Sequence, residues 1–155
     1  MSTVKQLLGT RTQLAGANTA LNSLPSGNYV NVGTVTFASS SKTPLTVKFE
    51  LAVTPGTVAG NKQAVLFAQQ TLDGTNFETG PVSGVTTTDE PNLTFVGVLP
   101  LNTNATLQRK IFDLAATFAG AMPYGAKMIV KNDSGAAFAA SGNDVFTLDV
   151  SGDVT

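Results

Sequence analysis

The sequence contains no cysteine and no histidine, and these two absences exclude much of the commonest protein chemistry. Without cysteine, the 155 residues can form neither disulfides nor thiolate metal sites. Without histidine, they lack the commonest general base and the commonest ligand of transition metals. We therefore expect no metal, no cofactor and no enzymatic activity.

Charge is scarce as well, since charged residues make up 12% of the chain, about half the share of an ordinary soluble domain. The formal net charge is −1, and the longest basic run is the pair Arg109-Lys110. A nucleic-acid-binding protein normally concentrates its basic residues, so we expect no nucleic-acid partner. A surface rich in Thr, Ser, Asn, Gln and Gly needs little desolvation when it is covered, which suits contact with other proteins.

Long apolar runs are missing too. No run approaches the length of a membrane span, and residues 1–9 lack the apolar region and the cleavage site of a secretory signal peptide. We expect no membrane partner and synthesis in a cytoplasm.

The chain has many short apolar stretches with a period of two. Residues 45–53 alternate apolar and polar, as a strand with one buried face does, and residues 64–68 are apolar on both faces. Turn residues separate these stretches at the spacing of a β-sandwich. The pattern predicts one all-β domain over residues 28–155, a β-sandwich of jelly-roll-like form. The predicted core contains Val47, Phe49, Leu51, Phe67, Phe95, Ile129, Val130 and Leu148.

Two segments need a local explanation. The apolar phase changes between Val32 and Val35, and a β-bulge at Gly33-Thr34 would keep both halves of that strand facing the core. Residues 107–118 fit a helical face and a strand alternation equally well. We expect a strand there that runs into a short turn or helix before Pro123.

Residues 1–27 differ from the rest of the chain. Leu7, Leu14 and Leu21 recur every seven residues, but Gly9 and Gly16 weaken any helix by about 1 kcal/mol each relative to Ala. One interpretation is a frayed terminus that packs on its own domain. The other, which we prefer, is an N-terminal arm whose three leucines bind another subunit or another protein. The entropy lost when this segment becomes ordered is offset only if the leucine side chains are buried.

The stretch "TLDGTNFETGP", residues 71–81, carries two carboxylates, Asp73 and Glu78, in a hydroxyl-rich loop. A calcium loop of the EF-hand type needs acidic or amide residues at alternating positions before its glycine, and Gly74 comes too early for that. Asp-Gly and Thr-Asn are favourable turn residues. We therefore predict a structural turn.

No other motif predicts catalysis. Asp89 and Glu90 are adjacent, so an extended chain directs them to opposite faces, where they cannot readily act on one bond. No serine lies in a Gly-x-Ser-x-Gly elbow, and "GPVSG", residues 80–84, lacks the Gly-Lys-Ser/Thr end of a phosphate loop.

Two long stretches, "TPLTVKFELAVTPGTVAGNKQAVLFAQQTLDGTNFETGPVSGVTTTDEPNLTFVGVLPLNTNA" and "KMIVKNDSGAAFAASGNDVF", carry a resemblance. The pieces "TLDGTNFETGP", "TDEPNL", "LPLNTN" and "VKNDSGAAFAASGN" resemble loop and strand-edge signatures of small structural proteins from the morphogenesis regions of tailed bacteriophages. The resemblance covers about residues 44–150. It implies a virion component, most like a capsid decoration (cement) protein with a jelly-roll-like fold.

The expected function is therefore non-catalytic: a homo-oligomer made in the host cytoplasm that binds the major capsid protein and stabilises the shell from the virion surface. The first alternative is a tail or baseplate component, such as a tube, adaptor or fibre-hub subunit. The second is a carbohydrate-binding β-sandwich. That use favours exposed aromatic platforms, and this chain has no Trp and only two Tyr.

Overall fold

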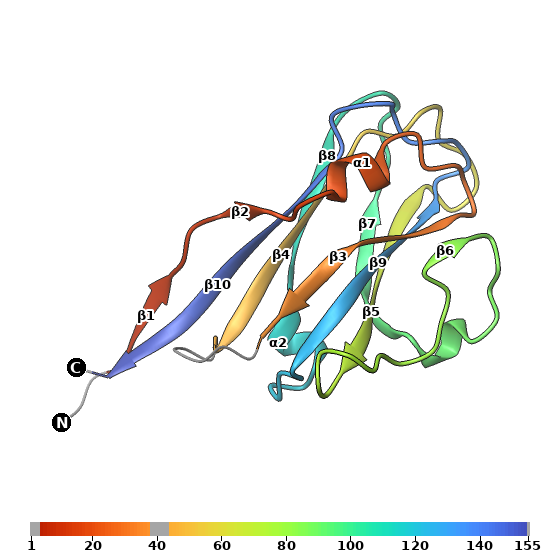
Figure 1. Cartoon of the computed structure of the whole chain (residues 1–155). Helices are drawn as coiled ribbons and strands as arrows, with labels where there is room; N and C mark the ends of the chain where they lie inside the picture. Colours follow the sequence, from red (N-terminus) through yellow and green to blue (C-terminus); the bar gives the residue numbers. More distant parts are fainter. Residues whose placement is uncertain (1–3, 38–43, 155) are drawn as a thin grey trace.

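The computed structural model describes residues 4–37 and 44–154, which form two antiparallel β-sheets packed face to face (Figure 1). Sheet A has the strand order β1-β10-β4-β8, and β2 also pairs with β10. Sheet B has the order β6-β3-β9-β5-β7. The predicted all-β sandwich is confirmed.

The bounds of the elements follow the chain in order. They are β1 Val4–Leu8, β2 Thr12–Gln13, α1 Ala17–Leu21, β3 Tyr29–Thr36, β4 Thr46–Val53, β5 Gln63–Thr71, β6 Ser83–Gly84, η1 Glu90–Asn92, β7 Thr94–Pro100, β8 Gln108–Asp113, α2 Leu114–Thr117, β9 Gly125–Asp133 and β10 Asp144–Val154. No helix in the described part of the chain is long and apolar enough to cross a membrane.

The longer strands pair in a nested order. With the two-residue strands β2 and β6 set aside, β1 pairs with β10, β3 with β9, β4 with β8, and β5 with β7. The first strand thus pairs with the last, the second with the next to last, and so on inwards. The pairs β10–β4 and β9–β5 then complete the two sheets. This is the arrangement of a jelly roll, as the sequence predicted.

The main core lies between the sheets. On β4, Val47, Phe49, Leu51 and Val53 are fully buried, as the alternation of residues 45–53 predicted. The strands β5 and β9 also contribute buried side chains, including Leu66 and Val130.

Both local predictions are confirmed in kind, but the bulge lies earlier than predicted. The β3–β9 register shifts between Asn31 and Gly33, so the extra residue is Val32 and not Gly33-Thr34, and Val32 and Val35 are both buried. The side chain of Asn31 accepts a hydrogen bond from the Gly33 N–H at 2.9 Å, which stabilises the bulge. Residues 108–117 are a strand followed by the one-turn helix α2.

Sheet B is also covered on its outer face. The connection between β5 and β7 must cross this face, because β6 within it pairs with β3 on the far side of β9. Leu93 of this connection packs on the sheet in a second apolar cluster, whose other members are Tyr29, Val65, Phe67 and Ile129. Lys131 over the Tyr29 ring also pairs with Glu90 of the connection, at 2.8 Å. The outer face of sheet B is therefore buried by the chain itself over β3, β9 and β5.

The structure differs from the predicted division into an arm, 1–27, and a domain, 28–155. Of the first segment, the described residues from 4 onward belong to the same sandwich: β1 and β2 pair with β10, and α1 contacts both β10 and β3. Ala17 and Leu21, one helical turn apart, are fully buried in the main core. Residues 1–3, 38–43 and 155 of the two predicted segments lie outside the described residues.

The core prediction was wrong for two residues, Phe95 and Leu148. Phe95 lies on the edge strand β7 and is 58% exposed, although its ring makes an edge contact with Phe67. Leu148 is half-buried on the outer face of sheet A, because its partner on β4 is Lys48. The inward position of β10 is taken instead by Val145, which pairs with Leu51. The six other predicted core residues are buried.

Candidate functional site

The three leucines predicted to bind a partner do not share one surface. Leu21 is 0% exposed in the main core and cannot contact a partner in this fold. Leu14 is half-buried and packs over Gly33, where an added Cβ would lie 2.7 Å from a Leu14 methyl carbon. Leu7, on β1, is 40% exposed. Only Leu7 is substantially available to another molecule.

The outer face of sheet A carries a groove that the sequence analysis did not identify. Its volume is about 310 Å³. Strand pairing places Phe146 beside Glu50, Leu148 beside Lys48, and Ile111 next to Glu50 on the other side. The lining consists of Arg11, Lys48, Glu50, Ile111, Phe112, Asp113, Phe146, Thr147 and Leu148. It is therefore an apolar floor between charged side chains.

Arg11 forms one wall of this groove. It comes from the connection between β1 and β2, and its guanidinium lies over the Phe146 ring, with Cζ 3.2 Å from the ring centre. Its Nε and Nη2 donate to the two carboxylate oxygens of Glu50, each at 3.0 Å. A bidentate pair of this kind fixes the guanidinium more firmly than a single contact does. Arg109 also approaches Glu50, at 3.5 Å.

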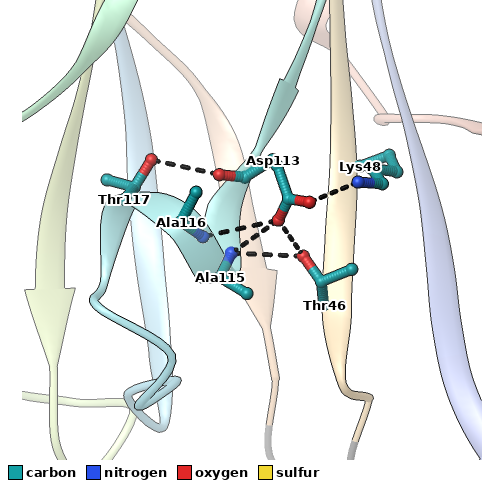
Figure 2. A network of polar contacts seen from close by, with 6 residues as sticks. All are labelled: Thr46, Lys48, Asp113, Ala115, Ala116 and Thr117. Carbon is teal, nitrogen blue, oxygen red and sulfur yellow. Dashed lines mark hydrogen bonds and ion pairs between the residues drawn. The ribbon is translucent and has the colours of Figure 1, made fainter.

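Asp113, at the end of β8, also lines the groove, and Figure 2 shows its polar contacts. Its carboxylate accepts hydrogen bonds from Lys48 Nζ and Thr46 Oγ1 across the sheet. The same carboxylate accepts the main-chain N–H of Ala115 at 3.0 Å, so Asp113 is the N-cap of α2. One side chain thus joins β4, β8 and α2.

The ion pairs shift the pKa values of the groove residues. The hydrogen bonds from Arg11 lower the pKa of Glu50 despite partial burial, and Glu50 in turn raises the pKa of Arg11. Partial burial by itself would raise the pKa of Asp113, but the hydrogen bonds from Lys48 and Thr46 outweigh it and the pKa is lowered. Both carboxylates are therefore ionised and paired at neutral pH.

This arrangement suits binding of a protein surface. The carboxylates are already paired with cations, so a partner that covers the groove leaves no lone carboxylate behind. The most accessible apolar side chain is Ile111, which is 63% exposed. Apolar centres with a polar, charged rim are typical of protein interfaces.

The loop with Asp73 and Glu78 is a turn in the structure. Asp73 Oδ1 accepts the main-chain N–H groups of Asn76 at 2.7 Å and Thr75 at 2.8 Å. Gly74 has the left-handed conformation, with φ of 78°. These hydrogen bonds, from Asn76 first and then Thr75, hold the pKa of Asp73 well below its usual range. Among the described residues, no group of three or more acidic side chains is placed to hold a metal ion.

The sequence held a partial signal for the groove. In β10 both apolar phases are occupied, by Val145 on one side and by Phe146 and Leu148 on the other. A strand of this kind can present apolar residues on both faces. The prediction placed the face of Leu148 in the core, whereas the structure buries Val145 there. The contribution of Arg11 could not be predicted, because it depends on β2 pairing with the far end of the chain.

Comparisons with protein-family models, with curated proteins and with solved structures gave no match.

Proposed function

We propose that this protein is a structural, non-catalytic component of a tailed-bacteriophage virion, and that it binds the capsid shell as a decoration protein. The resemblance of residues 44–150 to phage structural proteins supports the virion role. The jelly-roll strand order is compatible with it, since virus capsid domains are among the proteins with this architecture. Many other functions use the same fold, so the assignment depends on the surface rather than on the fold.

The observation that carries the proposal is the difference between the two outer faces. The connection between β5 and β7 covers the outer face of sheet B over β3, β9 and β5. In the described part of the chain, no comparable connection covers the groove of sheet A, and Ile111 remains exposed there. A protein that covers one sheet with its own chain and leaves the other open has a surface for a partner. In this proposal the major capsid protein is that partner.

Copy number tests the assignment to the shell. Decoration proteins follow the symmetry of the head and are present in large numbers, whereas tail and baseplate parts are few. We expect quantitative mass spectrometry of purified particles to give a head-like copy number, and cryo-electron microscopy to show the sandwich on the outside of the shell. A copy number that matches the tail would replace the decoration role by the tail alternative, and absence from particles would overturn the virion role.

A substitution tests the groove. Ile111→Asp places a charge on the apolar floor without touching the core, because Ile111 is exposed. The matched control is Leu72→Asp, in the turn that follows β5, where the leucine is 87% exposed. On particles that lack the protein, we expect Ile111→Asp to weaken binding by about tenfold or more and the control to leave it unchanged. Equal effects of the two variants would show that the groove is not the contact.

A further inference from the structure

The strand β1 forms a ribbon with the end of β10 that extends beyond the rest of the sandwich (Figure 1). The pairing of β10 with β4 stops at Val150 and Thr46, whereas β1 pairs with β10 as far as Val154. Leu7 and Leu8 point to opposite faces of the ribbon and are 40% and 72% exposed. A two-stranded ribbon without a packed face is only marginally stable in water, so a third strand would stabilise it.

The hydrogen-bond phase shows which groups face outward. The Gly9 N–H donates to the Asp149 carbonyl at 2.7 Å. Because main-chain groups alternate in direction along an antiparallel strand, Leu7 and Lys5 also turn theirs toward β10. Val4, Gln6 and Leu8 therefore turn their N–H and C=O groups to the open edge.

This edge has little protection against pairing. Natural proteins guard exposed edges with prolines, bulges and charges. The strand β1 contains no proline, its register with β10 is continuous, and Lys5 is its one charged residue. Within the described residues it has no other strand beside it.

We propose that β1 pairs with β1 of a second copy, antiparallel, about a two-fold axis that passes midway between Gln6 of one copy and Gln6 of the other. Gln6 then lies opposite Gln6 of the second copy, and Val4 lies opposite Leu8. All outward main-chain groups of the strand find partners, in about six hydrogen bonds. Sheet A continues from one copy into the other.

The side chains select this register over its neighbours. A two-fold axis at Lys5 sets two lysines directly opposite each other, which is destabilising. An axis at Leu7 leaves the outward main-chain groups of Val4 without a residue of β1 opposite them. With the axis at Gln6, Lys5 lies opposite Leu7, and the low net charge of −1 adds little repulsion between the copies. Two-fold dimers are also the commonest closed assemblies of soluble proteins.

The absence of cysteine allows a direct test in the full-length chain. In a hydrogen-bonded antiparallel pair the two Cα atoms lie about 5.5 Å apart, within the range that a disulfide spans. Gln6→Cys should therefore give a disulfide-linked dimer under mild oxidation. Leu8→Cys is the matched control, because two Leu8 positions would be about 13 Å apart in this register. Failure of Gln6→Cys to crosslink, or equal crosslinking of both variants, would overturn the proposal.

The solution mass gives a second, independent test. We expect light scattering across a concentration series to show a dimer for the unaltered chain and a monomer for Gln6→Pro. Gln6 donates nothing to β10, so its proline variant keeps the β1–β10 pairing and should keep the melting temperature of the monomer unit. A monomeric unaltered chain, or a Gln6→Pro variant that remains dimeric, would contradict the inference. Neither test uses phage particles, so the result is separate from that of the proposed virion role.

Discussion

Replacing Leu21 by Ala tests whether the N-terminal segment belongs to the domain. Leu21 is 0% exposed and lies in the main core beside Ala17, on the helix that contacts both sheets. Truncating a buried leucine to alanine costs about 2–5 kcal/mol, through lost burial and the cavity left behind. The complete burial of Leu21 places it in the upper part of that range. This is a large fraction of the 5–15 kcal/mol, roughly, that stabilises an ordinary domain.

The assay is urea denaturation followed by circular dichroism, with Leu7→Ala as the matched control. Leu7 is 40% exposed, so its truncation should change the free energy of unfolding by about 0.5 kcal/mol or less. Deletion of residues 2–24 should abolish the cooperative transition, because it removes the edge strand and Leu21 together. If Leu21→Ala costs no more than Leu7→Ala, the segment is not packed in the core, and the reasoning that placed it there is refuted.

Three further predictions concern the groove, the bulge and acid. Asp113→Ala should lower the free energy of unfolding by about 0.5–2 kcal/mol, because α2 loses its N-cap, and Asp113→Asn should cost less; equal costs would contradict the capping role. Gly33→Ala should cost about 1–3 kcal/mol in urea denaturation, since φ is 132° and the new Cβ meets Leu14, and no loss would show that the bulge relaxes freely. The pKa values of Glu50, Asp73 and Asp113 are lowered by folding, so their stabilisation is present above the unfolded pKa of about 4 and is lost as pH falls through the folded values. The urea concentration at the unfolding midpoint should therefore decrease as the pH is lowered below about 4. A midpoint that stays constant or rises over that range would contradict the prediction that these carboxylates stabilise the fold when ionised.

The sequence predicted the sandwich well where one strand face alone is apolar. In β4, Val47, Phe49 and Leu51 alternate with polar residues, so the pattern identifies the buried face without knowledge of the neighbours. A bulge in β3 was predictable for the same reason, because a phase change between Val32 and Val35 needs an extra residue, although its exact position, between Asn31 and Gly33, was not.

The prediction failed where the chain's own far segments decide burial. The sequence of β10 has apolar residues on both faces, so it does not show which face is buried. Only the pairing of Leu148 with Lys48 shows that Leu148 lies on the outer face of sheet A. Leu21 was assigned to a partner because residues 1–24 have too few apolar side chains and too many glycines to fold alone. They do not fold alone: β2 and β1 pair with β10, the last strand of the chain.

The two proposed surfaces are compatible, and together they give the groove a stronger role. Leu8 lies opposite Val150 on the face of sheet A that also carries Leu148 and Phe146. A two-fold axis perpendicular to the sheet keeps that face on the same side in both copies. The dimer would then present two grooves in one direction, toward one surface. Since a second attachment held by the first can raise the overall affinity by about 10²–10⁴, a groove that binds weakly by itself would suffice to hold the dimer on a repeating shell.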